Sequence, residues 1–252
     1  MKRFGCLLFL LLLAACARAP RHVWTEPPTA DALLQRVAET TGQVSSLDAA
    51  AKVSLTTGGK FVSSQQFLLV EKPDRLRVDA LTGFGQLVLQ LATDGQQLSV
   101  FTNTTVPGHF YQGPATAENL IRFTRIPLAA KDMVRLLLYD PPVIGADRRQ
   151  VFAKDELLVL RLENSELQQE ILFNQQLELV GSSYSSEGEV ILEVLYDNIL
   201  EEKRFPQTVR FDVAAETTQA TIKFRELQVN VEIPPERFQL QKPANLKVET
   251  LP

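Results

Sequence analysis

The chain has 252 residues, of which 45% are hydrophobic and 22% charged, and its net charge is −4 at pH 7. This composition is typical of a soluble globular protein, and the lack of a basic excess excludes a nucleic-acid binder, which would need a positively charged surface. Both cysteines, Cys6 and Cys16, lie near the amino terminus, so the body of the chain has no cysteines for a disulfide framework.

Residues 1–15 predict a secretory signal peptide. Lys2 and Arg3 form a positive start, and an apolar run follows that is too short to span a bilayer comfortably. Residues 16–28 contain three prolines and no apolar periodicity, so we expect a flexible tether there. Its Trp24 could dock on the body of the protein or lie at the membrane surface.

The signal peptide ends at a candidate lipidation site. Residues 13–16, Leu-Ala-Ala-Cys, resemble the lipobox of bacterial lipoproteins. The resemblance implies cleavage before Cys16, diacylglycerol on the Cys16 sulfur and an acyl chain on its new amine, and several chains would hold the protein firmly to a membrane. The alternative is an ordinary signal peptide with a chance cysteine. Ala17 follows in place of aspartate, which by the sorting rule of Gram-negative lipoproteins implies the outer membrane and its periplasmic face.

Alternating apolar and polar residues predict antiparallel strands through the first half of the body. A helix comes first, over residues 29–41, with Thr29 as a candidate N-cap and its apolar residues on one face. Asp94 and Gly95 predict a hairpin turn, and residues 103–114 a loop or a loose strand pair. The expected strands cover residues 50–56, 61–70, 75–80, 86–92 and 97–102.

The turn between the third and fourth of these strands, residues 81–85, is unusually apolar. Gly83 and Gly85 allow tight turning, but turns are usually polar, and this one carries Leu81 and Phe84. An exposed apolar side chain forgoes roughly 1.5–3 kcal/mol of burial energy. The turn therefore either folds back onto the core or contacts a membrane or a partner.

Two helices and a second set of strands follow. Thr116 is a candidate N-cap for a short helix that ends before Pro127, and a second helix is expected over residues 129–139. From Val151 the chain returns to strands, and the tail from residue 233 is expected to form an irregular edge. The expected strands cover residues 156–162, 169–173, 177–184, 190–197, 208–213 and 219–231.

These elements predict one domain over residues 29–252, because no repeat or linker divides it. A sheet of about eleven strands must curl, and three amphipathic helices need an apolar surface, which the concave face of a curled sheet provides. The expected fold class is therefore mainly β (α+β), a strongly curved antiparallel sheet with helices as a lid over its concave face.

The residue types that carry most enzyme chemistry are scarce in the body of the chain. His109 is its one histidine, so no histidine pair can hold a metal, and no thiol is present. Residues 181–185, Gly-Ser-Ser-Tyr-Ser, lack the second glycine of a nucleophile elbow and lie in a predicted strand. No phosphate loop or dinucleotide fingerprint occurs. We therefore predict that the protein is not an enzyme and has no metal or cofactor.

Motifs in both halves carry a resemblance to a known family. They are residues 74–78, Asp-Arg-Leu-Arg-Val, the turn 82–85, Thr-Gly-Phe-Gly, and a short helix that leads to residues 126–128, Ile-Pro-Leu, before a second helix. These motifs resemble the LolB family of outer-membrane lipoproteins, which receive lipoproteins from the carrier LolA. Residues 230–240, together with Pro243, are similar to the carboxyl end of LolA-like domains.

The resemblance extends over most of residues 45–245, with one difference. The family often carries tryptophan in an early strand and in the second lid helix, whereas residues 66–70 and 134–138 contain none. A receptor of this family and a related lipoprotein with another hydrophobic cargo therefore both fit the sequence.

The resemblance implies an unclosed barrel whose hollow holds the acyl chains of cargo passed on by a LolA-like carrier. It also implies that Phe84, with Leu81 beside it, meets the outer membrane during delivery. The implied wall of the hollow consists of Leu76, Val78, Leu87, Leu89, Leu91, Leu98 and Val100. The implied lid residues are Leu120, Ile121, Met133, Leu136 and Leu137.

Two functional hypotheses follow. In the first, the protein is an outer-membrane lipoprotein that binds acyl chains in a hydrophobic cavity and acts in lipoprotein or lipid localisation. In the second, it is a structural or assembly lipoprotein of the envelope that binds protein partners, with a packed core and no lipid cargo. An enzyme fits least well, and loss of turnover on mutation of His109 would revive that reading.

Overall fold

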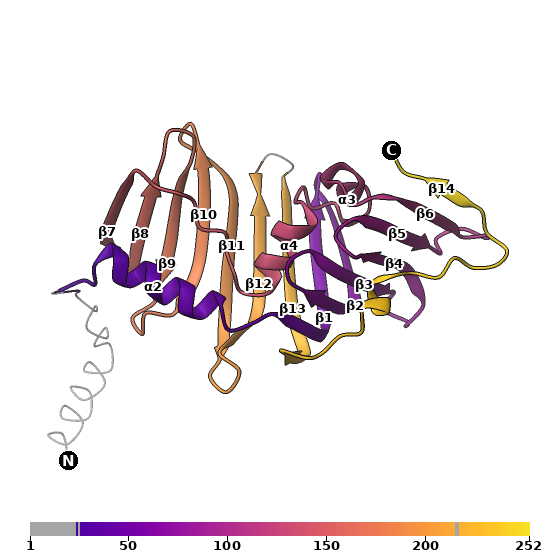
Figure 1. Ribbon diagram of the computed structural model, residues 1–252, viewed down its shortest axis with the longest axis horizontal. Helices are drawn as coiled ribbons and strands as arrows, with labels where there is room; N and C mark the ends of the chain where they lie inside the picture. Colours follow the sequence, from indigo (N-terminus) through magenta and orange to yellow (C-terminus); the bar gives the residue numbers. More distant parts are fainter. Residues whose placement is uncertain (1–23, 25, 215–216) are drawn as a thin grey trace, which may run out of the picture.

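One continuous sheet forms most of the protein (Figure 1). The computed structural model describes residues 24, 26–214 and 217–252, so the predicted signal peptide and Cys16 lie outside the described residues. The strands are β1 (Ser46–Thr57), β2 (Lys60–Glu71), β3 (Arg75–Leu81), β4 (Leu87–Thr93), β5 (Gln97–Thr102), β6 (His109–Pro114), β7 (Arg148–Lys154), β8 (Leu157–Glu163), β9 (Gln168–Phe173), β10 (Leu179–Ser186), β11 (Glu189–Leu200), β12 (Phe205–Val213), β13 (Thr218–Val229) and β14 (Val248–Thr250).

The sheet consists of two antiparallel meanders joined side by side. Its strand order is β14-β6-β5-β4-β3-β2-β1-β13-β12-β11-β10-β9-β8-β7. We call β1–β6 the first meander and β7–β13 the second. They meet where β1 pairs antiparallel with β13, from Leu47 opposite Val229 to Thr56 opposite Gln219. Because β14 and β7 are separate edges, the sheet is curved but does not close into a barrel, as expected.

The structure has three strands more than the eleven or so that the alternating pattern predicts. β6 lies where a loop or loose pair was expected, and β14 lies in the tail, where it pairs in parallel with β6. β7 adds an edge strand beside β8. All three are at or near the sheet edges, where exposed side chains weaken the apolar alternation on which the prediction depends.

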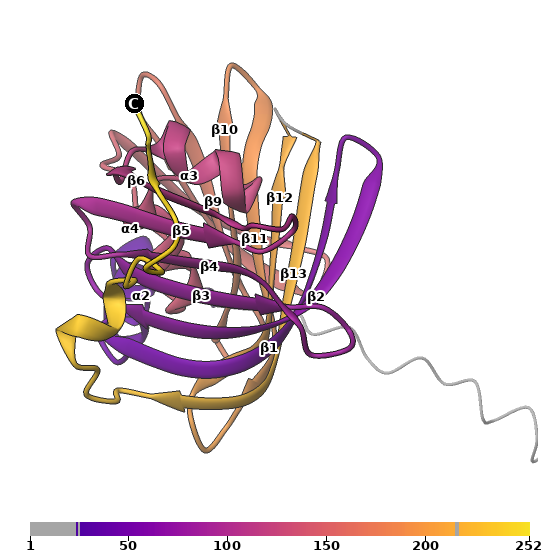
Figure 2. The same cartoon turned by 90° about the vertical axis from the view of Figure 1, so that its right-hand side faces the viewer.

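In the part of the chain that the structure describes, three α-helices accompany the sheet, as predicted. They are α2 (Ala30–Thr41), α3 (Ala117–Thr124) and α4 (Ala130–Leu137). The side chains of Thr29 and Thr116 cap α2 and α3 by accepting hydrogen bonds from the backbone N–H groups of Ala32 and Asn119, both at 3.2 Å. Figures 1 and 2 show α2 and α4 on the concave face, and Figure 2 shows β3–β5 running across the direction of β10–β12.

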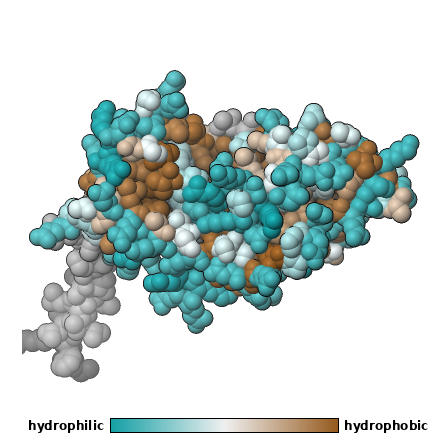
Figure 3. Space-filling model, in the orientation of Figure 1, coloured by the Kyte–Doolittle hydropathy of each residue, from teal (hydrophilic) through white to brown (hydrophobic). Residues whose placement is uncertain are grey.

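The concave face of the second meander is filled by side chains and by the segment that follows α4. Gln169 of β9 is fully buried; it accepts a hydrogen bond from Ile144 N–H at 3.0 Å and donates to the Pro142 carbonyl at 2.9 Å. Tyr184 of β10 also donates to the Pro142 carbonyl, at 2.6 Å. Figure 3 shows apolar surface over β8–β10 on this face, and polar side chains in the middle of the molecule as viewed.

An ion-pair group ties the end of α4 to the turn between β2 and β3. The Asp140 carboxylate lies 2.8 Å from both Lys72 Nζ and Arg135 Nη2. Burial alone would raise the pKa of Asp140, but the hydrogen bonds from Arg135 and Lys72 outweigh burial and lower that pKa below its usual value. Asp140 therefore holds a negative charge that fixes α4 against the first meander.

The carboxyl-terminal tail packs on the convex face before it reaches the sheet edge. Ile233 and Phe238 are buried against Leu69 of β2, with Pro235–Phe238 forming a short 3-10 helix. Arg77 on the convex face of β3 donates a hydrogen bond to the Arg237 carbonyl at 3.1 Å. The tail then ends as β14, so the irregular edge predicted for it includes a covering segment and a short strand.

Candidate functional site

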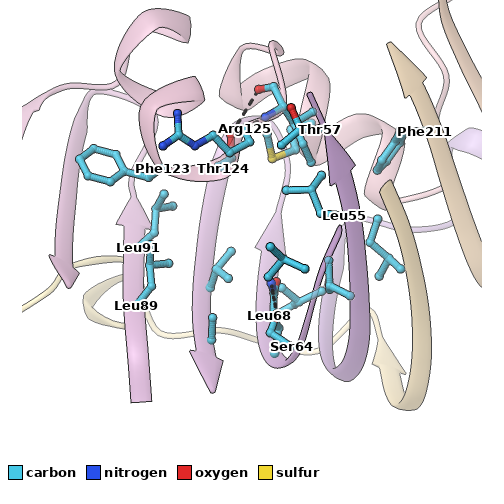
Figure 4. A pocket seen from close by; sticks show the side chains of 18 of the residues that line it. Leu55, Thr57, Ser64, Leu68, Leu89, Leu91, Phe123, Thr124, Arg125 and Phe211 are labelled. Carbon is cyan, nitrogen blue, oxygen red and sulfur yellow. Dashed lines mark hydrogen bonds between the residues drawn. The ribbon is translucent and has the colours of Figure 1, made fainter. Parts of the chain in front are cut away.

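The concave face of the first meander borders a cavity of about 710 Å³ (Figure 4). Strands β1–β4 form one wall, and the end of α3, the turn after it and α4 form the opposite wall, with a contribution from β12 and β13. The lining residues are Val53, Leu55, Thr57, Gly58, Lys60, Val62, Ser64, Gln66, Leu68, Leu76, Val78, Ala80, Val88, Leu89, Leu91, Phe123, Thr124, Arg125, Ile126, Met133, Leu137, Phe211 and Ile222.

Strand alternation gives this cavity its apolar wall. Leu76, Val78 and Ala80 are every second residue of β3 and all line the cavity. Between them, Arg77 and Asp79 point to the convex face, where they form an ion pair at 3.1 Å. The same period of two places Val53 and Leu55 of β1 and Leu89 and Leu91 of β4 on the wall. β2 contributes both apolar and polar side chains, so the wall as a whole is mostly, but not entirely, apolar.

The cavity opens at one end of the first meander. Because β1–β6 are antiparallel neighbours, the β1–β2, β3–β4 and β5–β6 turns all lie at the same end of these strands, which we call the turn end. The lining residues Gly58, Lys60 and Val62 lie in or beside the β1–β2 turn and are exposed, as is Arg125. We call these four residues the mouth. The buried lining residues, such as Leu76 and Leu137, form the deep end.

Several residues implied by the family resemblance do line this cavity. On the sheet they are Leu76, Val78, Leu89 and Leu91, and on α4 they are Met133 and Leu137. The others are placed elsewhere. Leu98, Val100, Leu120 and Leu136 are fully buried in the packed core, and Leu87 and Ile121 are half-buried outside the cavity wall. The cavity is therefore shifted away from β5 toward β1 and β2.

Sequence reasoning missed the parts of the wall that come from β1, β2, β12, β13 and the end of α3. The sequence shows that Val53 and Leu55 share one face of β1. It does not show that β1 pairs with both β2 and β13, and this pairing places the two residues on the cavity wall. Phe123 and Thr124 end α3 and Arg125 follows in the turn before α4, and the short helical pattern gave no sign that these residues face a cavity. Phe123 adds an aromatic ring to the wall, and Arg125 adds one of the two charges of the mouth.

The turn that carries Phe84 is held by hydrogen bonds and projects its aromatic ring into solvent. Phe84 is 97% exposed. Thr82 Oγ1 accepts hydrogen bonds from the backbone N–H groups of Phe84 and Gln86, at 3.3 and 3.2 Å, and Gly85 adopts φ +80°. The structure excludes the alternative in which Phe84 folds back onto the core, whereas Leu81, at the end of β3, is half-buried.

Phe84 is one of several exposed apolar residues at the turn end. Phe61 and Val62, beside the β1–β2 turn, are 69% and 60% exposed, and Val106 in the β5–β6 turn is 99% exposed. Soluble proteins rarely gather large exposed apolar side chains in one region unless they meet a partner or a membrane. The turn end is therefore both the open end of the cavity and an apolar surface.

Titratable groups with shifted pKa values lie away from the cavity. Burial raises the pKa of Tyr139, Tyr184 and Tyr196 above the usual value, and each hydroxyl donates a hydrogen bond to a backbone carbonyl. His109 lies 2.6 Å from a Glu249 oxygen between β6 and β14. Within residues 24, 26–214 and 217–252, no group of three His, Cys, Asp or Glu side chains could hold a metal ion.

Solved structures show the fold to which this geometry belongs. A DUF1329 family protein from Desulfovibrio piger is 12% identical, with a TM-score of 0.54 over 83% of this chain and 95% of that one. A LolA superfamily protein from Nitrosomonas europaea is 12% identical, with a TM-score of 0.53 over 85% and 99%. A putative outer membrane lipoprotein-sorting protein domain from Vibrio parahaemolyticus is 7% identical, with a TM-score of 0.51 over 83% and 97%.

The protein therefore has the LolA-like fold, as the sequence motifs implied. No protein-family model matches the sequence, and no curated protein matches it either. None of the helices in the described part of the chain is long and apolar enough to cross a membrane.

Proposed function

We propose that the protein is an outer-membrane lipoprotein that binds acyl chains non-covalently and helps to place lipoproteins or lipids in that membrane. The observation that carries the proposal is the apolar cavity of about 710 Å³, open at the same end of the sheet as the exposed Phe84. Binding cavities for small molecules commonly measure roughly 300–1,000 Å³. A wall built mainly from aliphatic and aromatic side chains favours contact with hydrocarbon.

The position of the mouth supports transfer between the cavity and a membrane. If the turn end rests on a bilayer, the exposed side chains of Phe61, Phe84 and Val106 enter it, and each gains burial energy. An acyl chain could then leave the membrane beside these residues and enter the cavity without crossing water. No nucleotide-binding motif is visible in the sequence, so transfer runs down an affinity gradient, in which each tenfold preference needs about 1.4 kcal/mol.

Location and partners follow from the sequence motif and from the class of fold. Acylation of Cys16 would anchor the chain to the periplasmic face of the outer membrane. Two of the similar structures are described as a LolA superfamily protein and as an outer membrane lipoprotein-sorting domain, which supports an envelope role in binding rather than catalysis. A periplasmic LolA-like carrier is the partner that would deliver acylated cargo.

A pair of adjacent serines allows a matched test of the cavity. Ser64 of β2 lines the cavity, whereas Ser63 faces the opposite side, with its hydroxyl 3.4 Å from that of Ser54. We expect Ser64→Trp to fill the mouth side of the cavity and to abolish co-purification of acyl lipid, because an indole ring occupies the space of the chain. Native mass spectrometry of the purified protein measures the bound lipid.

Ser63→Trp is the control and should retain bound lipid at the wild-type level. Circular dichroism of both variants separates loss of binding from loss of folding. Wild-type protein that carries no lipid, and that cannot be loaded with palmitate, would contradict the proposal. A stable protein complex in a pull-down, together with that result, would favour the structural or assembly lipoprotein instead.

A further inference from the structure

The charges on the cavity wall have one sign. Its charged lining residues are Lys60 and Arg125, and no Asp or Glu is among the residues that line it. This contrasts with the chain as a whole, which has 30 acidic and 26 basic side chains. Both cations belong to the mouth, so the opening of an otherwise apolar cavity is positively charged.

These two cations have no partners in the part of the protein that the structure describes. Neither the Lys60 ammonium nor the Arg125 guanidinium forms an ion pair or side-chain hydrogen bond with a described residue, whereas Arg75, Arg77 and Arg135 all pair with carboxylates. The hydroxyl of the neighbouring Thr124 already has a hydrogen-bond partner. Thr124 Oγ1 donates to the Leu120 carbonyl at 2.9 Å. The cations are therefore the free polar groups of the mouth.

Arg125 stands at a position where the backbone favours a different residue. It follows the last turn of α3 with φ +61°, and its N–H donates to the Ile121 carbonyl, an arrangement in which glycine is preferred. A left-handed backbone is unfavourable for a residue that carries a side chain. Figure 4 shows the Arg125 side chain extending from this turn toward Phe123, over the strand that carries Leu91 and Leu89. Arg125 thus reaches the cavity from a turn, as one of several non-glycine residues with positive φ in the described part of the chain.

We infer that the cavity takes an acyl lipid with an anionic head group, and that Arg125 and Lys60 bind this head group while the acyl chain lies along the apolar wall. The inference rests on the proposed function and narrows its ligand. Guanidinium and ammonium groups bind phosphate and carboxylate oxygens through charge-assisted hydrogen bonds. A phosphate or carboxylate at the mouth supplies the negative charge that the wall lacks, and its chain continues toward Leu76 and Leu137.

This assignment separates two kinds of cargo. A lipoprotein anchor with diacylglycerol on sulfur and an acyl group on its amine carries no charge in its lipid part. A phospholipid or a fatty acid carries its charge directly beside the chains. Two unpaired cations at the mouth favour the second kind, so the structure points to an anionic membrane lipid over a fully acylated cysteine.

Displacement of the neutral dye Nile red from the full-length protein tests the inference. The competitors are palmitoyl-lysophosphatidylglycerol, palmitate and monopalmitoylglycerol, which share one chain and carry a phosphodiester, a carboxylate and no charge. We expect at least one anionic competitor to bind about tenfold more tightly than monopalmitoylglycerol, a preference that added salt reduces. Which anionic lipid binds better distinguishes phosphate from carboxylate.

Single substitutions test which residues cause the preference for anionic lipids. We expect Arg125→Gln and Lys60→Gln each to reduce the anionic preference several-fold without changing the affinity for monopalmitoylglycerol. Arg122→Gln removes an exposed arginine of α3 that does not line the cavity and should change neither. Equal binding of all three competitors overturns this inference but leaves the proposed function standing. If none of them binds, both fail.

Discussion

Phe84 is a single residue whose exposure has a testable functional consequence. Its ring is 97% exposed at the tip of a hydrogen-bonded turn, and burial of such a side chain is worth roughly 1.5–3 kcal/mol. If the turn end contacts the membrane during delivery, Phe84→Glu should slow transfer of bound acyl lipid to vesicles by about tenfold or more. Release of a fluorescent acyl lipid into vesicles measures the rate.

Phe67→Glu is the matched control for this change. Phe67 is also exposed, at 54%, but it lies in the middle of β2 and away from the turns. Its replacement should leave the rate unchanged, and both variants should bind lipid in solution as the wild type does. An unaltered transfer rate in Phe84→Glu would remove membrane insertion from the proposed function.

At the residue scale, the sequence identified side chains whose type is unusual or characteristic at their position in the chain. Phe84 could be singled out because an aromatic between two glycines is unusual in a turn. Thr29 and Thr116 were recognisable as caps because each precedes a helical pattern. Arg125 could not be found in this way. An arginine after a short helix resembles any solvated residue until the cavity beside it is known.

Gln169 shows how an element is held in place by one buried amide. The side chain of this β9 residue bonds to the backbone of the segment that crosses the second meander, at Ile144 and Pro142, and also donates to Ser182 Oγ at 2.9 Å. Gln169→Leu would leave buried backbone groups without partners, so we expect a loss of about 2–3 kcal/mol in the free energy of unfolding. Urea denaturation measures this loss.

The neighbouring glutamine provides the comparison. Gln168 is half-buried on the other face of β9, and its side chain forms no hydrogen bond with a described residue. Gln168→Leu should therefore change the free energy of unfolding by less than about 0.5 kcal/mol. Similar losses in both variants would show that the segment after α4 is not fixed by the Gln169 amide.

At the element scale, a strand could be predicted from the sequence only where burial requires a recurring pattern of apolar residues. β3 and β4 were predicted almost to the residue because apolar side chains recur at every second position of each strand. β8 is largely apolar in sequence, and Val159 is buried on the face opposite to Leu158 and Leu160. β7 and β14 have mostly exposed side chains, so alternation carries no information about them.

The arrangement of the whole molecule depends on a pairing that no local pattern encodes. Strands β1 and β13 join the two meanders, yet their alternation would suit many other partners. The sequence therefore predicted a curled sheet but could not say which strands meet in its centre. It also could not distinguish a filled interior from a cavity, because leucines that line a space and leucines that interlock show the same periodicity.

The cavity lies mainly on the first meander, with only Phe211 and Ile222 contributed by the second, and this asymmetry predicts how the two halves of the molecule respond to a ligand. A ligand at 100 times its dissociation constant stabilises the folded state by about 2.7 kcal/mol. Amides that exchange through local opening should respond only where the ligand makes contact. With palmitate bound, we therefore expect slower hydrogen exchange in β2–β4 and in the turn after α3, and unchanged local exchange in β8–β10, whose concave face is already filled.

Hydrogen exchange followed by mass spectrometry, with and without palmitate, makes this comparison within one molecule. The Ser64→Trp variant should show no change in either meander, because its cavity is occupied by the indole ring. Protection that rose equally in β2–β4 and in β8–β10 would mean that palmitate binds elsewhere or tightens the whole sheet. The sheet would then act as one mechanical unit, and the division into a binding half and a packed half would be wrong.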